Sequence, residues 1–258
     1  PGLGPVVGTL IAHYGSWHIN FLVLSILSGV LLLSVYWMFP ETLREKNRHA
    51  IHPIKIFKNY FALFKASGYL VYLLILGLSL GMVYGALVEA PGLIINEMHL
   101  NKQWFYVVAF GIVFAFMLGS FLCTKLCSRV HENWILALGM LIILIGSLVL
   151  WGVMSLGFVN IWGFLIPAIV IFVGISFEIP IATARALAPF NNNAGSAAAM
   201  MGCFQMGFAS LITVAVTFVE LKPIFTIPVC FAGLSLIGLC IILGYIYHLT
   251  MRLKKLRA

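Results

Sequence analysis

One acidic residue, Glu178, lies inside a long apolar stretch and is the most informative candidate for chemistry in this chain. It falls about 9 Å from the middle of the stretch 161–184 if that stretch is a helix. An ionised carboxylate deep in a membrane-spanning helix costs roughly 2.5–3.5 kcal/mol, so it must face a cavity or a partner. Glu178 is therefore a candidate for binding a proton or sensing a cation. The alternative is a structural ion pair with Arg185, two turns further along the same face.

Two other polar side chains in apolar stretches are candidates for contact with protons or substrate. Gln205 lies close to the middle of the stretch 196–219. Its amide can hydrogen-bond a substrate or bridge two helices, and bridging is worth about 0.6 kcal/mol on average. Glu89 precedes Pro91 at the end of an apolar stretch, where a solvated helix end is the alternative interpretation.

Aromatic residues and methionine are the side chains that would line an apolar drug cavity. The same residue types fill ordinary helix contacts, and packing is the more common role for any one of them. The candidates for a cavity lining are Tyr84, Phe177, Phe204 and Met206.

Several kinds of chemistry are absent from the sequence. The chain contains no Asp, no phosphate-binding GxxxxGK[ST] loop, and neither an HExxH nor a GxSxG motif. These absences argue against ATP-driven transport within the chain and against a metalloprotease or hydrolase. Cys123 and Cys127 share a helix face, but their spacing is not that of a redox or zinc pair, so we interpret them as packing residues. We expect no enzyme activity, no cofactor and no metal.

The elements that position these residues are long apolar helices. The chain has 258 residues, of which 62% are hydrophobic and 9% charged. A spanning helix needs about 20 apolar residues, and continuously apolar stretches exclude the alternating strands of a membrane barrel. The sequence therefore predicts an all-α polytopic membrane protein with spans at about 18–39, 68–90, 104–126, 134–154, 161–184, 196–219 and 226–247.

The positive charges gather on one side of the predicted membrane topology. If loops alternate across the membrane, one side receives thirteen of the 15 Lys and Arg residues, and the other receives Lys102 and Lys222. The positive-inside rule then places the C-terminus in the cytoplasm. The excess of Lys and Arg on one side orients the protein in the membrane, and these residues contact anionic lipid headgroups. No nucleic-acid partner is needed to explain it.

Small residues and prolines indicate how the helices pack. Gly77, Gly81 and Gly85 recur every four residues, as do Gly111, Ala115 and Gly119, and such stripes allow close helix contact in a membrane. We expect Pro167, Pro180 and Pro228 to kink or interrupt their helices.

The order of the segments along the chain predicts half of a twelve-helix protein made of two bundles. The first apolar stretch, Pro1 to about Ala12, is too short to span and has no initiator Met, so we expect the chain to be the rear part of a longer protein. The polar segment 40–67 separates this end from six further helices. We therefore divide the chain into 1–39, a cytoplasmic basic linker 40–67, a six-helix bundle 68–247 and a basic cytoplasmic tail 248–258.

Three groups of residues form recognisable motifs: Gly4, Pro5 and Gly8, then Trp17, Phe21 and Pro40-Glu41-Thr42-Leu43, and the run from Pro180 to Met206. They resemble the motifs of bacterial drug exporters of the major facilitator superfamily. The opening residues resemble the GPxxGG antiporter motif of helix five, with Thr9 in place of its last Gly. His18 stands where the family has Arg in W-R-x-x-F. The region around helices ten and eleven resembles the bicyclomycin-resistance (Bcr/CflA) drug:proton antiporters.

This resemblance implies a major facilitator fold, with the C-terminal six-helix bundle and the last one and a half helices of the N-terminal bundle. It implies proton-coupled efflux of drugs or small amphipathic metabolites by alternating access, in a bacterial inner membrane, by a protein that is monomeric when complete. Gly4, Pro5 and Gly8 would let helix five pack and bend, which limits leakage. The alternatives are a non-transporting remnant or scaffold and a channel, which no pore-lining charge or filter motif favours.

Overall fold

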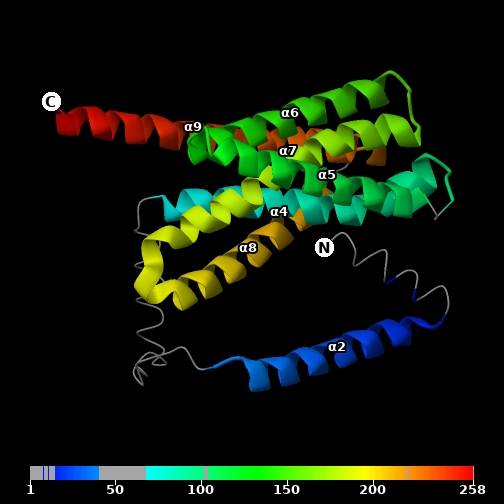
Figure 1. Ribbon diagram of the computed structural model, residues 1–258. Coiled ribbons are helices and arrows are strands. Elements are labelled where there is room, and N and C mark those ends of the chain that lie inside the picture. The colour runs from blue at the N-terminus through cyan, green and yellow to red at the C-terminus, as the bar shows by residue number, and fades with distance from the viewer. Residues whose placement is uncertain are drawn as a thin grey trace. The chain divides into compact units, whose positions relative to one another are not determined.

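The computed structural model describes residues 8, 11, 15–40, 68–101, 104–219 and 221–257. The chain divides into two compact units, Pro1–Lys55 and Ile56–Ala258. Every regular element in the described ranges is helical, as Figure 1 shows. Seven of these helices are long and apolar enough to cross a membrane, which confirms the seven predicted spans. The protein is an all-α, multi-pass membrane protein.

In the first unit, α2 (Trp17–Met38) is an apolar helix of 22 residues. Its three serines, Ser25, Ser28 and Ser34, donate to the carbonyls four residues earlier, each at 2.8 Å. These hydroxyl groups are satisfied inside the helix, so the three serines can lie in an apolar environment without unpaired hydroxyl donors.

The second unit contains six spanning helices joined by short connections. A π-helical turn extends the first of them, and a 3₁₀ turn extends the fourth. The last helix is longer than expected, because residues 248–257 continue it where the sequence suggested a separate tail. The elements are α4 (Tyr69–Gly92) with the π-turn η2 (Leu93–Glu97), α5 (Trp104–Cys127), α6 (Glu132–Ser155), α7 (Ile161–Leu187) with the 3₁₀ turn η3 (Ala188–Asn193), α8 (Ala194–Thr217) and α9 (Pro223–Arg257).

Helix starts follow local capping chemistry. α4 begins after Gly68, whose φ of 90° suits glycine. Before α6, the His131 ring nitrogen Nδ1 accepts from the Asn133 amide at 3.3 Å. Before α7, Asn160 Oδ1 accepts from the Gly163 amide at 2.7 Å. These caps satisfy amides that a helix leaves unpaired in its first turn.

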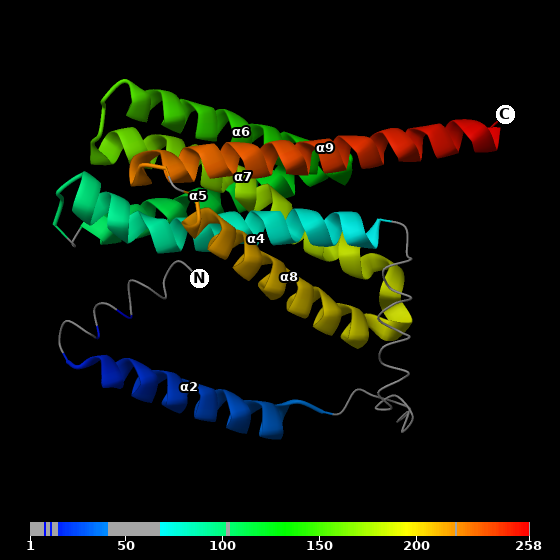
Figure 2. The ribbon, with the colours of Figure 1, turned by 180° about the vertical axis from the view of Figure 1, so that it is seen from behind.

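Helix α7 is the centre of the second unit. It packs along α6, α5 and α4, while α6 also packs along α9, and α4 along α8 (Figures 1 and 2). By contrast, α8 rests mainly on α4. The residues of α7 are therefore the ones most enclosed by neighbouring helices.

Both predicted glycine stripes lie at helix contacts. A side chain at Gly77 would meet Phe208 of α8 at 2.5 Å, and one at Gly81 would meet Ile212 of α8 at 2.7 Å. The second stripe faces α7, because a side chain at Gly119 would run into Ser176. Small residues let these backbones approach, as expected from the sequence.

A third glycine contact, between α6 and α7, was not predicted from the sequence. Gly139 and Gly174 face one another: a Cβ on Gly139 would lie 3.0 Å from the Gly174 carbonyl, and one on Gly174 would lie 2.8 Å from the Gly139 carbonyl. Gly146 packs in the same way against Ile171. Gly139 and Gly146 are seven residues apart on α6, and Gly174 has no other glycine four residues away on α7. Neither helix therefore shows the four-residue repeat that predicts a glycine contact.

The prolines do not interrupt their helices. α7 continues through Pro167 and Pro180, and α9 through Pro228. The break in this part of the chain comes at Phe190 in η3, whose backbone is not helical (φ −114°, ψ 37°). The chain turns there from α7 into α8 (Figure 1).

Candidate functional site

Glu178 is completely enclosed in α7, with 0% of its surface exposed. Its Oε1 occupies the space that a side chain on Gly139 of α6 would need, and its Cδ lies 3.1 Å from that position. Gly139 has no side chain, so the carboxyl group fits against the α6 backbone. The carboxyl thus lies at the α6–α7 contact, one turn beyond the Gly139–Gly174 approach.

Among the described residues, no side chain hydrogen-bonds or pairs with the Glu178 carboxyl. The backbone N–H of Met140 on α6 is directed at the carboxyl. On the α5 side, the Cys123 thiol lies within electrostatic reach. A buried carboxylate without a counter-charge is costly, whereas a neutral carboxylic acid is much less so. The site therefore suits the protonated form.

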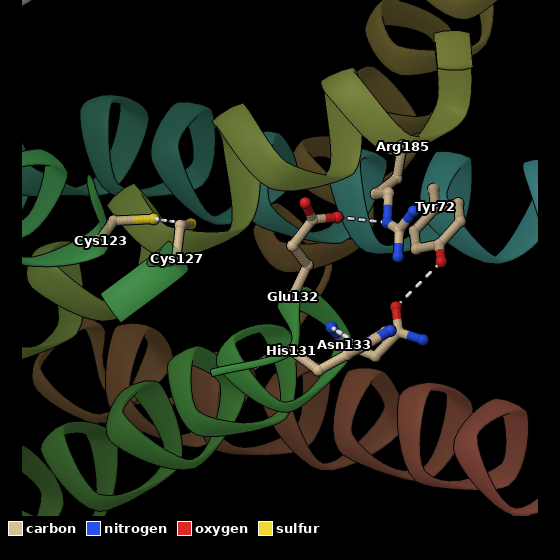
Figure 3. Close-up of polar contacts among 7 residues, drawn as sticks. All are labelled: Tyr72, Cys123, Cys127, His131, Glu132, Asn133 and Arg185. Carbon is tan, nitrogen blue, oxygen red and sulfur yellow. Dashed lines mark hydrogen bonds and ion pairs between the residues drawn. The ribbon is translucent and has the colours of Figure 1, made fainter. Parts of the chain in front are cut away.

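The alternative pairing of Glu178 with Arg185 does not form. Arg185, in the last turn of α7, pairs instead through Nε with Glu132 Oε2 in the first turn of α6 (Figure 3). Each residue also carries the charge that its helix end favours. The two side chains are 35% and 41% exposed, so the pair lies at one end of the bundle and leaves Glu178 unpartnered.

A neutral hydrogen bond lies next to this ion pair. Tyr72 of α4 donates its hydroxyl to Asn133 Oδ1 of α6 at 2.9 Å, as Figure 3 shows. The Tyr72 ring meets the edge of Tyr245 of α9, with ring centres 5.7 Å apart. Together with the ion pair between Arg185 and Glu132, these two interactions join α4, α6, α7 and α9 at one end. These interactions were not predicted, because partners on different helices leave no spacing signal in the sequence.

The two cysteines of α5 lie together near the same end. Their Sγ atoms are 4.0 Å apart, with Cys123 buried and Cys127 exposed (Figure 3). In the described part of the chain, no three side chains of His, Cys, Asp or Glu converge as a metal site. The interpretation of these cysteines as packing residues stays a prediction.

Of the remaining candidates, Phe177 precedes Glu178 in the chain and is also buried in α7. Tyr84 of α4 is 39% exposed, and its hydroxyl lies 3.9 Å from the Met206 sulfur of α8. Phe204 stacks on Phe208 with ring centres 5.5 Å apart, and Gln205 between these residues is partly buried. The structure thus brings Tyr84 and Met206 together on the α4–α8 pair.

Glu89 belongs to neither group. It is partly buried near the end of α4 and lies within electrostatic reach of Cys230 of α9. Of the antiporter-motif residues, Gly4 and Pro5 lie outside the described residues. Gly8 is described, and a side chain on it would come no closer than 4.0 Å to Asn20 Oδ1.

The chain is similar to known transporters over most of its length. Residues 1–216 match the family described as Major Facilitator Superfamily. An uncharacterized transporter of Rickettsia felis is 26% identical over 233 residues, which is 87% of this chain and 57% of that protein. Multidrug resistance protein D of Escherichia coli is 29% identical over 211 residues, covering 80% of this chain and 50% of that protein.

A bicyclomycin resistance protein homolog of Haemophilus influenzae is 25% identical over 264 residues, covering 100% of this chain and 63% of that protein. The chain thus spans about half to three fifths of the length of these relatives. One of these relatives has the name of the bicyclomycin-resistance subfamily, which the motif at helices ten and eleven predicted. On the match over residues 1–216 and the helical fold, the chain belongs to the Major Facilitator Superfamily.

Proposed function

We propose that the protein is a secondary active transporter that exports drugs or small amphipathic metabolites in exchange for protons, by alternating access. The names of the Escherichia coli and Haemophilus influenzae relatives support the substrate class. Proton coupling rests mainly on one observation: Glu178 is fully buried in a spanning helix and has no side-chain partner or counter-charge among the described residues.

The surroundings of Glu178 favour a proton over a drug as its ligand. The carboxyl is enclosed between α6 and α7, where glycine backbones leave room for the carboxyl and little else. A proton needs no further space, and its loss creates a buried charge that the present packing does not compensate. Release of the proton therefore favours a different arrangement of α7 relative to its neighbours, which is the kind of coupling that an antiporter needs.

The substrate would contact the α4–α8 pair. Tyr84 and Met206 meet there with exposed side chains, and Phe204 and Gln205 lie on the same part of α8. Methionine adapts to ligands of different shape, and an amide offers a hydrogen bond to polar groups of the substrate. We place the protein in the bacterial inner membrane, monomeric, with the C-terminal end of α9 in the cytoplasm.

Replacing Glu178 with Gln tests the proton role. In cells that express the protein, we expect Glu178→Gln to reduce pH-driven export of a fluorescent substrate such as ethidium by at least ten-fold, because Gln keeps the shape of the side chain but cannot bind and release a proton. Exchange of labelled for unlabelled substrate without a pH gradient should continue, because that exchange requires no net proton movement.

The matched control is Glu132→Gln, which removes an acidic group from the partly exposed ion pair and should keep most of the pH-driven export. Normal pH-driven export by Glu178→Gln at normal expression would rule out the proton role. Loss of both export and exchange would assign Glu178 to substrate binding or structure. A wild-type protein without any export would contradict the transporter proposal itself.

A further inference from the structure

The last turns of α9 form a basic end that extends beyond its helical neighbours. Figures 1 and 2 both show this end projecting past the other helices of the second unit. Arg252, Lys254 and Lys255 are exposed on it, and α9 continues as a helix to Arg257. Four cations in six residues directly after a spanning helix are typical of contact with anionic lipid.

The outward face of α9 indicates which surface this end meets. Counting back from Lys254 in steps of three or four residues gives one continuous exposed stripe, while Ile242 on the opposite face is buried at 0% exposure. The stripe is apolar along the spanning part, then reaches an exposed tyrosine and ends in lysine. Its residues are Val229, Gly233, Leu236, Cys240, Leu243, Tyr247, Met251 and Lys254.

The length of the stripe matches a bilayer. From Val229 to Tyr247 the helix rises about 27 Å, close to the ~30 Å thickness of the hydrocarbon core. From Lys222, which is exposed just before α9, to Arg252 the rise is about 45 Å, the thickness of a bilayer with its headgroups. Tyr247 therefore lies at the edge of the hydrocarbon, and Lys254 and Lys255 lie at the level of the phosphates.

We propose that the basic end of α9, formed by Arg252, Lys254 and Lys255, is a binding site for the headgroup of an anionic phospholipid. The apolar stripe selects a lipid over a soluble acidic partner, because the acyl chains of the lipid continue along the face that leads into the lysines. Only one cation marks the other end of the helix, so the site favours the leaflet that faces this basic end. The proposal does not depend on the identity of the exported substrate.

The site contacts the rest of the fold through α9. Tyr245, on the inward side of the same stretch of helix, packs against Tyr72 of α4. Tyr72 in turn bonds Asn133 of α6. A lipid that holds the end of α9 therefore acts next to the interactions that join α4, α6, α7 and α9.

The test measures lipid binding by the full chain in detergent micelles, using native mass spectrometry with phosphatidylglycerol as the anionic probe and phosphatidylcholine as the zwitterionic one. A triple variant, Arg252→Gln with Lys254→Gln and Lys255→Gln, removes three exposed cations of the site. Each charge near a membrane surface contributes about five-fold to binding, so we expect the affinity for phosphatidylglycerol to fall at least ten-fold. Binding of phosphatidylcholine should not change.

A control variant, Lys125→Gln with Arg129→Gln and Lys222→Gln, removes the same number of exposed cations elsewhere and should stay within two-fold of the wild type. Lys254→Arg with Lys255→Arg keeps the charge and should keep the affinity. An equal loss in the control, equal binding of both lipids by the wild type, or displacement of phosphatidylglycerol by inorganic phosphate would each overturn the proposal.

Discussion

At the scale of single residues, the hydrogen side chain of Gly139 determines where a carboxyl group can lie. Glu178 occupies the space of the missing side chain, and the Gly174 carbonyl closes the contact from α7. The burial of Glu178 was predictable, since a lone carboxyl in an apolar helix must turn inward. The surroundings of Glu178 were not predictable, because Arg185 pairs with Glu132 of α6, and the spacing of residues along α7 cannot reveal a partner on another helix.

The tightness of this contact predicts opposite results for two glycines of the same helix. Gly139→Ala should lower the free energy of unfolding by about 1–3 kcal/mol, because the new methyl group meets the carboxyl group and a backbone carbonyl that cannot rotate away. Gly152→Ala, with nothing within 4 Å, should be neutral or stabilise by up to about 1 kcal/mol through helix propensity. Thermal unfolding in micelles checks both, and equal effects would contradict the close contact.

At the scale of helices, the sequence predicted the elements better than their partners. The seven spans and both four-residue glycine stripes were recognisable because each is a regular pattern within one helix. The α6–α7 contact lacks such a pattern, and its glycines are matched only across the two helices. The extra length of α9 was missed because its last residues are basic, and a helix that leaves the bilayer no longer needs apolar residues.

Two interactions at the end of α6 are expected to differ in strength. Tyr72→Phe leaves the buried Asn133 side chain without its donor and should cost about 1–3 kcal/mol of unfolding free energy. Arg185→Gln removes a partly exposed ion pair and should cost less than about 1 kcal/mol. Unfolding in micelles at matched ionic strength compares the two, and a larger cost for Arg185→Gln would show that the ion pair dominates this end.

At the scale of the whole molecule, the charge distribution predicts the orientation in the membrane. A green fluorescent protein fused after Ala258 should fluoresce, and alkaline phosphatase at the same place should be inactive, because the basic end of α9 is retained in the cytoplasm. Alkaline phosphatase fused after Lys222, on the opposite side, should be active. Active phosphatase after Ala258 would invert the topology and place the proposed lipid site in the outer leaflet.

The depth of Glu178 also has an electrical consequence. Glu178 lies seven residues from Arg185, a rise of about 10 Å, which is roughly one third of the hydrocarbon thickness. A proton that reaches Glu178 from this end crosses the same share of the membrane voltage, worth about 0.8 kcal/mol per 100 mV. In the proposed exchange of substrate for protons, the occupancy of this carboxyl by a proton would therefore respond to voltage as well as to acidity, even for a substrate that carries no charge.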